Sequence, residues 1–141
     1  MNNLLEWKDQ QEIIRQTTMK WYSLGIQLFP QQEKPVEITF DLTGKTSGKA
    51  WTGNNCSFFR IEYNWQLAQE NMDTFLSQTV PHEVAHIIAN EFFKEMWPDG
   101  VLHSCLWEFV MIKFGKVPNK HHHYDCSKIR GNKVAQVVDV E

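Results

Sequence analysis

The hydrophobic pattern changes its period along the chain, and these changes predict the order of the elements. Between residues 8 and 29, apolar side chains recur at helical spacing among polar ones, without an intervening proline. This segment is therefore predicted to form an amphipathic helix. Residues 36–42 alternate and are rich in β-branched and aromatic side chains, which predicts a strand. Residues 50–53 and 57–63 predict two more strands, joined as a hairpin around residues 54–55.

The second half of the chain returns to helical spacing. From about Leu67, apolar residues predict helical structure that runs to about Met96, with Pro81 inside it. Proline is tolerated in the first turn of a helix and kinks a helix interior. Either a helix begins near Thr79, or one longer helix bends at the proline.

A strong helix breaker at residues 97–100, Trp-Pro-Asp-Gly, precedes another predicted helix. This second helix covers the largely apolar residues 102–114 and is closed by Gly115. Residues 116–141 have a loop-like composition, except for a late segment at 134–140, for which a strand and a mobile tail are both open. The pattern as a whole predicts an α+β domain with an N-terminal helix, a small three-stranded sheet and two further helices.

The predicted helix after the sheet contains His82-Glu83-Val84-Ala85-His86, which matches the zinc-hydrolase pattern H-E-x-x-H. Residues four apart share one face of a helix, so the imidazoles of His82 and His86 can point at one ion. Neutral imidazole suits zinc, and a catalytic zinc keeps one position open for water. Glu83 follows the first histidine, where its carboxylate can reach that water. The plainer interpretation is a pair of core histidines with ordinary hydrogen-bond partners.

A third ligand would decide between these interpretations. The extended pattern H-E-x-x-H-x-x-G-x-x-H is excluded, because Ala89 and Phe92 occupy its Gly and His positions. A glutamate is one alternative, the candidates being Glu91, Glu95 and Glu108. A histidine is the other, since His103 stands in a mainly apolar stretch just after the predicted turn. A lone histidine on an apolar face is usually a core residue, but after an H-E-x-x-H motif we favour ligation by His103.

Composition indicates the setting of this chemistry. The 141 residues suffice for one domain, and a 42% apolar share with six Trp and nine Phe suffices for a core. The chain has no run of about 18 apolar residues, so no membrane span is expected, and its N-terminus does not resemble a secretory signal. Three widely spaced cysteines indicate reduced thiols rather than disulfides. We therefore expect a cytoplasmic protein, whose oligomeric state the sequence leaves open.

Charge is unevenly distributed along the chain. The net charge is −3, yet residues 1–112 hold 8 Lys and Arg against 14 Asp and Glu. Residues 113–133 hold six basic residues against one acidic residue, Asp125. The six basic residues are Lys113, Lys116, Lys120, Lys128, Arg130 and Lys133. Beside an active site such a segment is able to steer a polyanion, and a solvated basic tail is an equally good interpretation.

Five segments carry a pattern shared with a known family. They are Gly44-Lys45 through Gly48-Lys49-Ala50, Ile61-Glu62-Tyr63-Asn64, Val80-Pro81-His82-Glu83-Val84-Ala85-His86, His103-Ser104-Cys105-Leu106-Trp107 and Gly115-Lys116-Val117-Pro118. The fourth segment is similar to the family pattern H-G-x-x-W. Through these segments the chain resembles, over roughly residues 13–125, the SprT-like metalloproteases, the group that includes the Spartan DNA–protein crosslink proteases.

The resemblance implies a zincin-like minimal metalloprotease domain, with Zn²⁺ as its cofactor. It implies His82, His86 and His103 as the metal ligands and Glu83 as the catalytic base. The expected function is then a zinc metalloendopeptidase that hydrolyses protein substrates, including proteins bound or crosslinked to DNA.

The chain departs from the family pattern at two places. Ser104 stands where the family usually has a glycine. The C-terminal zinc ribbon of many relatives is missing, because Cys126 has no C-x-x-C partner. We therefore expect a SprT-like domain at residues 1–125 and a tail without a ribbon at residues 126–141. Any DNA contact is expected to be weak and non-specific, the candidate residues being Lys116, Lys120, Lys128 and Arg130.

Two rival functions stay open at this point. One is a zinc-stabilised module that binds DNA or protein without cleaving it, although the intact Glu83 argues against it, because a structural site needs no base. The other is a zinc hydrolase that acts on a bond other than a peptide bond. For proteolysis, a sheet edge at residues 57–63 is a candidate to hold the substrate as an added strand. Tyr124 or one of His121–His123 is a candidate oxyanion donor, and the alternative is that they form an exposed polar loop.

Overall fold

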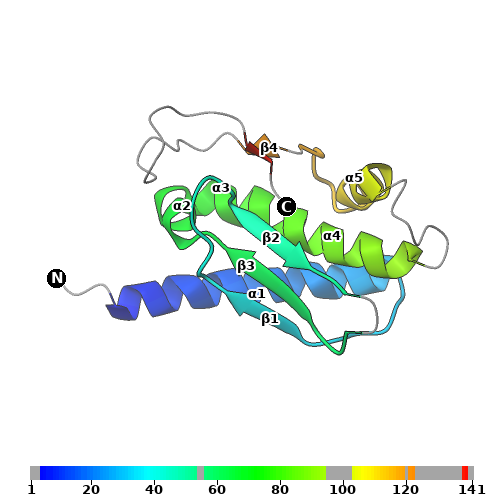
Figure 1. The fold of residues 1–141 in the computed structure, drawn as a ribbon, viewed down its shortest axis with the longest axis horizontal. Helices are drawn as coiled ribbons and strands as arrows, with labels where there is room; N and C mark the ends of the chain where they lie inside the picture. Colours follow the sequence, from blue (N-terminus) through cyan, green and yellow to red (C-terminus); the bar gives the residue numbers. More distant parts are fainter. Residues whose placement is uncertain (1–3, 54–55, 95–102, 120, 123–137, 140–141) are drawn as a thin grey trace.

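An N-terminal helix is followed by a small three-stranded sheet and then by further helices, as the hydrophobic pattern predicts (Figure 1). The computed structural model describes residues 4–53, 56–94, 103–119, 121–122 and 138–139, with described side chains at 6–53, 56–94 and 105–119. The elements are α1 (Leu4–Leu28), β1 (Val36–Thr39), β2 (Gly48–Trp51), β3 (Phe59–Tyr63), α2 (Trp65–Glu70), α3 (Met72–Thr74), a π-helical turn (Phe75–Thr79), α4 (Val80–Phe93), α5 (His103–Lys113), β4 (His121–His122) and β5 (Val138–Asp139). The predicted α+β class is confirmed.

The three-stranded sheet has the order β1-β3-β2. Strands β2 and β3 pair antiparallel, as the hairpin prediction requires, with Gly48 opposite Tyr63. Strand β1 pairs with β3 in parallel, however, so β3 lies in the centre of the sheet. The prediction of an exposed edge at residues 57–63 is therefore wrong, because β3 has a paired strand on each side. In the described part of the chain, the edges of this sheet are β1 and β2.

Helix α4 is the element around which the others pack. It contacts α1, β2 and α5, and in Figure 1 it lies between α1 and α5. Helix α1 approaches α4 closely at Gly25, where a Cβ atom would lie only 2.5 Å from Cγ1 of Ile88. Many of the buried hydrophobic residues come from α1, β3, α4 and α5, and they include Ile14, Tyr22, Phe59, Ile61, Tyr63, Val84, Ile87, Ile88, Trp107 and Met111.

The backbone stays helical through Pro81, so the longer of the two predicted helices is the one observed. Thr79, directly before α4, has helical dihedral angles of −67° and −44°. The preceding turn is π-helical, with the Val80 N–H donating to the Phe75 carbonyl five residues back. Proline has no N–H and its ring crowds the carbonyl four residues earlier, so a wider turn accommodates it without ending the helix.

Helix α5 ends where the sequence predicts, at a glycine. Gly115 has a positive φ of 79°, which glycine adopts readily. The Lys116 N–H donates to the Met111 carbonyl, and the Gly115 N–H donates to the Ile112 carbonyl. These two bonds form a Schellman motif, which satisfies the last carbonyls of the helix.

Of the two possibilities for the late tail segment, the structure has the strand, because β5 pairs antiparallel with β4. The predicted hairpin turn at residues 54–55 and the helix breaker at residues 97–100 lie outside the described residues. Within the described chain, no helix is both long enough and apolar enough to cross a membrane.

Candidate metal centre

Two histidine rings converge on one face of α4. The Nε2 atoms of His82 and His86 are 3.2 Å apart, and their ring centroids are 4.9 Å apart. His82 is buried and His86 is half-buried, so the pair lies at the boundary between core and solvent. The spacing of four residues predicts this convergence, because it places both side chains on one face of the helix.

The separation of the two nitrogen atoms suits a tetrahedral metal. A zinc ion bound to imidazole at about 2.0–2.1 Å holds two such nitrogens about 3.3–3.4 Å apart in tetrahedral geometry. The observed 3.2 Å is close to this value, so both rings can bind one ion with little movement. Imidazole nitrogen is also the donor type that zinc prefers. The donor pair therefore fits the cofactor that the sequence predicts.

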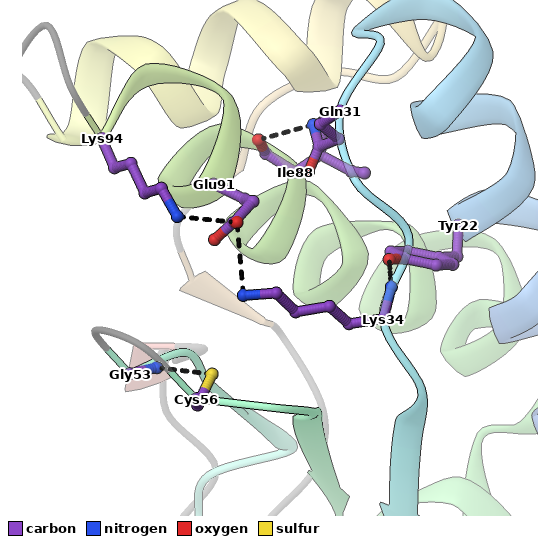
Figure 2. Close-up of polar contacts among 8 residues, drawn as sticks. All are labelled: Tyr22, Gln31, Lys34, Gly53, Cys56, Ile88, Glu91 and Lys94. Atoms are coloured by element: carbon purple, nitrogen blue, oxygen red, sulfur yellow. Dashed lines mark hydrogen bonds and ion pairs between the residues drawn. The ribbon is translucent and has the colours of Figure 1, made fainter.

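Two of the three glutamates considered as the third ligand have described side chains, and neither completes the site. Among the described residues, no three His, Cys, Asp or Glu side chains form a group able to hold a metal ion. The Glu91 carboxylate instead forms ion pairs with Lys34 at 3.4 Å and Lys94 at 2.9 Å (Figure 2). Glu108 is half-buried on α5 and belongs to no such group. Glu95 lies outside the described residues.

His103 is the first residue of α5, and its side chain lies outside the described set. Its place on the helix is nevertheless informative, because Trp107 stands four residues later on the same face. Helix α5 packs against α4, and its Trp107 contacts both His82 and His86. The backbone position of residue 103 is thus one helical turn before a direct neighbour of His82 and His86.

Trp107 covers both histidines from the α5 side. Its ring stacks on His86 at a centroid distance of 5.4 Å and an angle of 18°, and it lies 4.5 Å from the His82 ring. Its buried indole N–H donates to the His82 carbonyl at 3.1 Å. The sequence marks Trp107 as part of a family pattern, but its contact with both rings depends on how α5 packs.

Glu83 faces strand β2 of the sheet. Its side chain is fully buried, and it lies against Gly48 at the start of β2. Further along, the Asn90 side chain donates to Thr52 Oγ1 at 2.7 Å. Helix α4 and β2 therefore run in the same direction next to each other, from Glu83 and Gly48 to Asn90 and Thr52. In the described chain β2 pairs only with β3, and it also contacts the histidine helix α4.

The phenol of Tyr63 lies near Glu83 but does not serve the site as a proton donor. Thr18 donates its hydroxyl hydrogen to the Ile14 carbonyl at 2.7 Å, so Tyr63 donates to Thr18 Oγ1, also at 2.7 Å. Burial raises the pKa of Tyr63, and the nearby charge of Glu83 raises it further. The phenol therefore stays protonated, and its proton is held by Thr18.

Comparison with known proteins places this geometry in a family. The family model described as SprT-like matches residues 16–127, which is most of the chain. The chain belongs to the SprT-like family. The segment predicted from the resemblance, roughly residues 13–125, agrees with this match.

Individual SprT-like relatives show the same relationship. The chain is 32% identical over 96 residues to Protein SprT of Shewanella oneidensis, an alignment that covers 67% of this chain and 56% of that protein. It is 30% identical over 128 residues to Protein SprT of Vibrio atlanticus, which covers 90% of this chain and 72% of that protein. Protein SprT of Vibrio parahaemolyticus is 32% identical over 118 residues, with 83% and 67% covered. No solved structure matches the chain.

The basic segment of this SprT-like chain is described only at its start. The ammonium group of Lys113 lies 5.4 Å from the centroid of the Phe109 ring, and that of Lys116 lies 5.4 Å from the centroid of the Trp21 ring. The remaining candidates for a DNA contact, Lys120, Lys128 and Arg130, lie outside the described residues. Tyr124, His123 and the side chains of His121 and His122, which were considered as oxyanion donors, lie outside them as well.

Proposed function

We propose that this SprT-like chain is a zinc-dependent endopeptidase with a zincin-like active site. One observation carries the proposal: two imidazole nitrogens lie 3.2 Å apart, and the residue after the first histidine is a buried glutamate beside an edge strand. A zinc site with a purely structural role uses four protein ligands and needs no base. The combination of a metal-binding pair with a buried carboxylate therefore favours hydrolysis over a binding module.

His103 is the third ligand in this proposal. A helix places residues four apart on one face, and Trp107 on that face of α5 already contacts His82 and His86. A histidine one turn before Trp107 is therefore well placed to reach the same ion. Three histidines would leave the fourth position of zinc open, as a catalytic site requires.

The residues of the chain divide the chemistry between them. His82, His86 and His103 would hold the zinc, which would supply polarisation of the scissile carbonyl and a lower pKa for the attacking water. Glu83 accepts the proton of the attacking water and delivers it to the leaving amine. Its full burial holds the carboxylate in one place and keeps competing bulk water away from it.

The substrate is held as an extended strand along the outer edge of β2. This edge replaces the one at residues 57–63, because β3 is paired on both sides. Strand β2 begins at Gly48 beside Glu83 and runs next to α4, so a peptide added to it would pass the histidine face. Main-chain hydrogen bonds to an edge strand accept many sequences, which suits a protease with broad protein substrates.

Proteins held on DNA are the proposed targets of this activity. Lys116, Lys120, Lys128 and Arg130 would make weak phosphate contacts without reading base sequence. The thiols of Cys56 and Cys105 are not in disulfides, which suits a reducing compartment such as the cytoplasm. Replacement of Lys116, Lys120, Lys128 and Arg130 by glutamate should abolish DNA binding and any DNA-stimulated cleavage, and should leave the zinc content unchanged. Absence of binding by the unmutated protein at low salt would remove DNA from the proposal.

The proposed function is tested by a cleavage assay with metal removal and return. Purified protein is expected to contain about one zinc and to cleave a DNA-bound protein and an unstructured protein. Chelation should abolish cleavage, and added zinc should restore it. His103→Ala should lose the metal, whereas Glu108→Ala, a matched change on the same helix, should keep it. Full zinc content in His103→Ala would contradict the ligand assignment, and zinc-loaded protein that cleaves neither substrate would favour a binding module.

A further inference from the structure

Gly48 approaches the Glu83 side chain more closely than any other residue type would permit. A Cβ atom built on Gly48 would lie 2.9 Å from Cγ, 3.1 Å from Cδ and 3.0 Å from Oε2 of Glu83. These distances are shorter than ordinary van der Waals contact between carbon atoms, which begins at about 3.5 Å. The carboxyl arm of Glu83 therefore occupies the space that a side chain at position 48 would fill.

This requirement for glycine comes from space and not from backbone conformation. In the described chain, the glycines with positive φ are Gly44 and Gly115, so the backbone at Gly48 is one that other residues adopt. Gly53, which lies just beyond the end of β2, provides the contrast. A Cβ atom there would lie 3.7 Å from Cβ of Cys56, which is a normal contact.

Glu83 has little freedom to move away from an added Cβ. Its side chain is fully buried, and its backbone is fixed in the first turn of α4, two residues after Pro81. The shortest of the three distances involves Cγ, which moves only if the first side-chain torsion changes or if β2 retreats from α4. The first change would move the carboxylate itself, and the second would change its position relative to β2.

We propose that Gly48 is a positioning residue for the catalytic base, and that the missing side chain on β2 fixes where the Glu83 carboxylate lies. The inference rests on the proposed function for its catalytic meaning, but its packing claim stands independently of proteolysis. A displacement of about 1 Å in a reacting group can cost on the order of 100-fold in rate. Gly48 would thus control the catalytic step without contacting the substrate carbonyl or the metal.

A double-mutant cycle on thermal stability tests the packing claim. Gly48→Ala should lower the Tm by roughly 4–10 °C, because overpacking a filled space is destabilising. The same substitution in a Glu83→Ala background should cost little, because the arm that it meets has been removed. Gly53→Ala, the control, should leave the Tm nearly unchanged in both backgrounds. An equal loss of Tm from Gly48→Ala in the two backgrounds would overturn the proposal.

If Gly48→Ala does not fold by itself, the double variant still gives the answer. Folding of Gly48→Ala/Glu83→Ala would support the proposal, and its failure to fold would contradict it. Neither the Tm cycle nor the folding of the double variant needs catalysis. If the chain cleaves no protein, the proposed function is refuted, but the packing claim is still tested.

Kinetics and metal content test the positioning role. Gly48→Ala should keep about one zinc per chain and a KM within about twofold of the unmutated value, while kcat falls on the order of 100-fold. Gly53→Ala should keep both constants. An unchanged kcat in Gly48→Ala would show that Gly48 does not position the base.

Discussion

The two sides of α4 hold their functional groups in opposite ways. Toward the sheet, Glu83 lies against Gly48, where a side chain is missing from the edge strand. Toward α5, His82 and His86 lie against Trp107, the largest side chain available. The carboxylate of Glu83 thus occupies space that the missing side chain of Gly48 leaves open. The rings of His82 and His86 are instead held by the Trp107 ring that packs against them.

This difference teaches where each side is sensitive to mutation. The sheet side should tolerate no added atoms at Gly48, and damage there should appear in the catalytic step. The α5 side should tolerate no removed atoms at Trp107, and damage there should appear in metal binding and stability. The predictions below separate these two kinds of damage.

Truncation of Trp107 should have the largest effect on stability. Trp107→Ala removes a buried ring and its hydrogen bond to the His82 carbonyl, and should lower the free energy of unfolding by about 3–5 kcal/mol. Loss of the surface that orients the histidines should also weaken zinc affinity by about 10–100-fold. Urea denaturation and a zinc titration measure the two effects.

An exposed residue of the same helix provides the control. Ile112 is 59% exposed on α5, so Ile112→Ala should change the free energy of unfolding by no more than about 0.5 kcal/mol and leave zinc affinity unchanged. Zinc affinity in Trp107→Ala equal to that of this control would show that the indole does not orient the ligands.

A milder change on the sheet side should affect stability without affecting the metal. Thr52→Val keeps the shape of the side chain but removes the acceptor for the Asn90 amide. The free energy of unfolding should fall by about 0.5–1.5 kcal/mol, the usual contribution of one hydrogen bond. Zinc content, measured on the purified variant, should be the same as in the unmutated protein. A loss of zinc here would mean that the two sides of α4 are not separate.

The smallest effect on stability is expected from Tyr63, on β3 of the sheet, and only at high pH. Burial raises the pKa of Tyr63 above its value of about 10 in the unfolded chain, so the folded state holds this proton more tightly. The related stability is fully present below about pH 10 and is lost as the pH rises further. Tyr63→Phe should flatten this alkaline decline in a series of denaturation curves. A smaller slope should remain from Tyr22, whose pKa burial also raises. An unchanged slope would place the titration elsewhere.

The periodicity of apolar residues predicts where the helices and strands of this fold lie better than it predicts which of them pair or pack together. It locates α1, the β2–β3 hairpin and α5 because each leaves a local pattern of apolar positions. It misses the parallel pairing of β1 with β3, because the register between separate strands is not written in either strand alone. It also leaves Pro81 ambiguous, since a π-helical turn has no sequence pattern of its own.

The candidate site likewise has a part that the sequence predicts and a part that depends on tertiary packing. The spacing of His82 and His86 predicts their convergence, since helical geometry alone brings the two nitrogens together. The roles of Gly48 and Trp107 are tertiary, because each depends on which segment packs against α4. Neither role follows from the residue type, since a glycine in a strand and a tryptophan in an apolar helix have ordinary structural explanations.

The central claim is that Glu83 acts as the base of a zinc endopeptidase. The most direct measurement compares Glu83→Gln with the unmutated protein at matched zinc content. The assay follows cleavage of a DNA-binding substrate protein, once with DNA present and once without DNA. Glutamine preserves the shape of the buried side chain, so fold and zinc should be retained while cleavage falls roughly a hundredfold or more. Cleavage by Glu83→Gln at the rate of the unmutated protein would contradict the account.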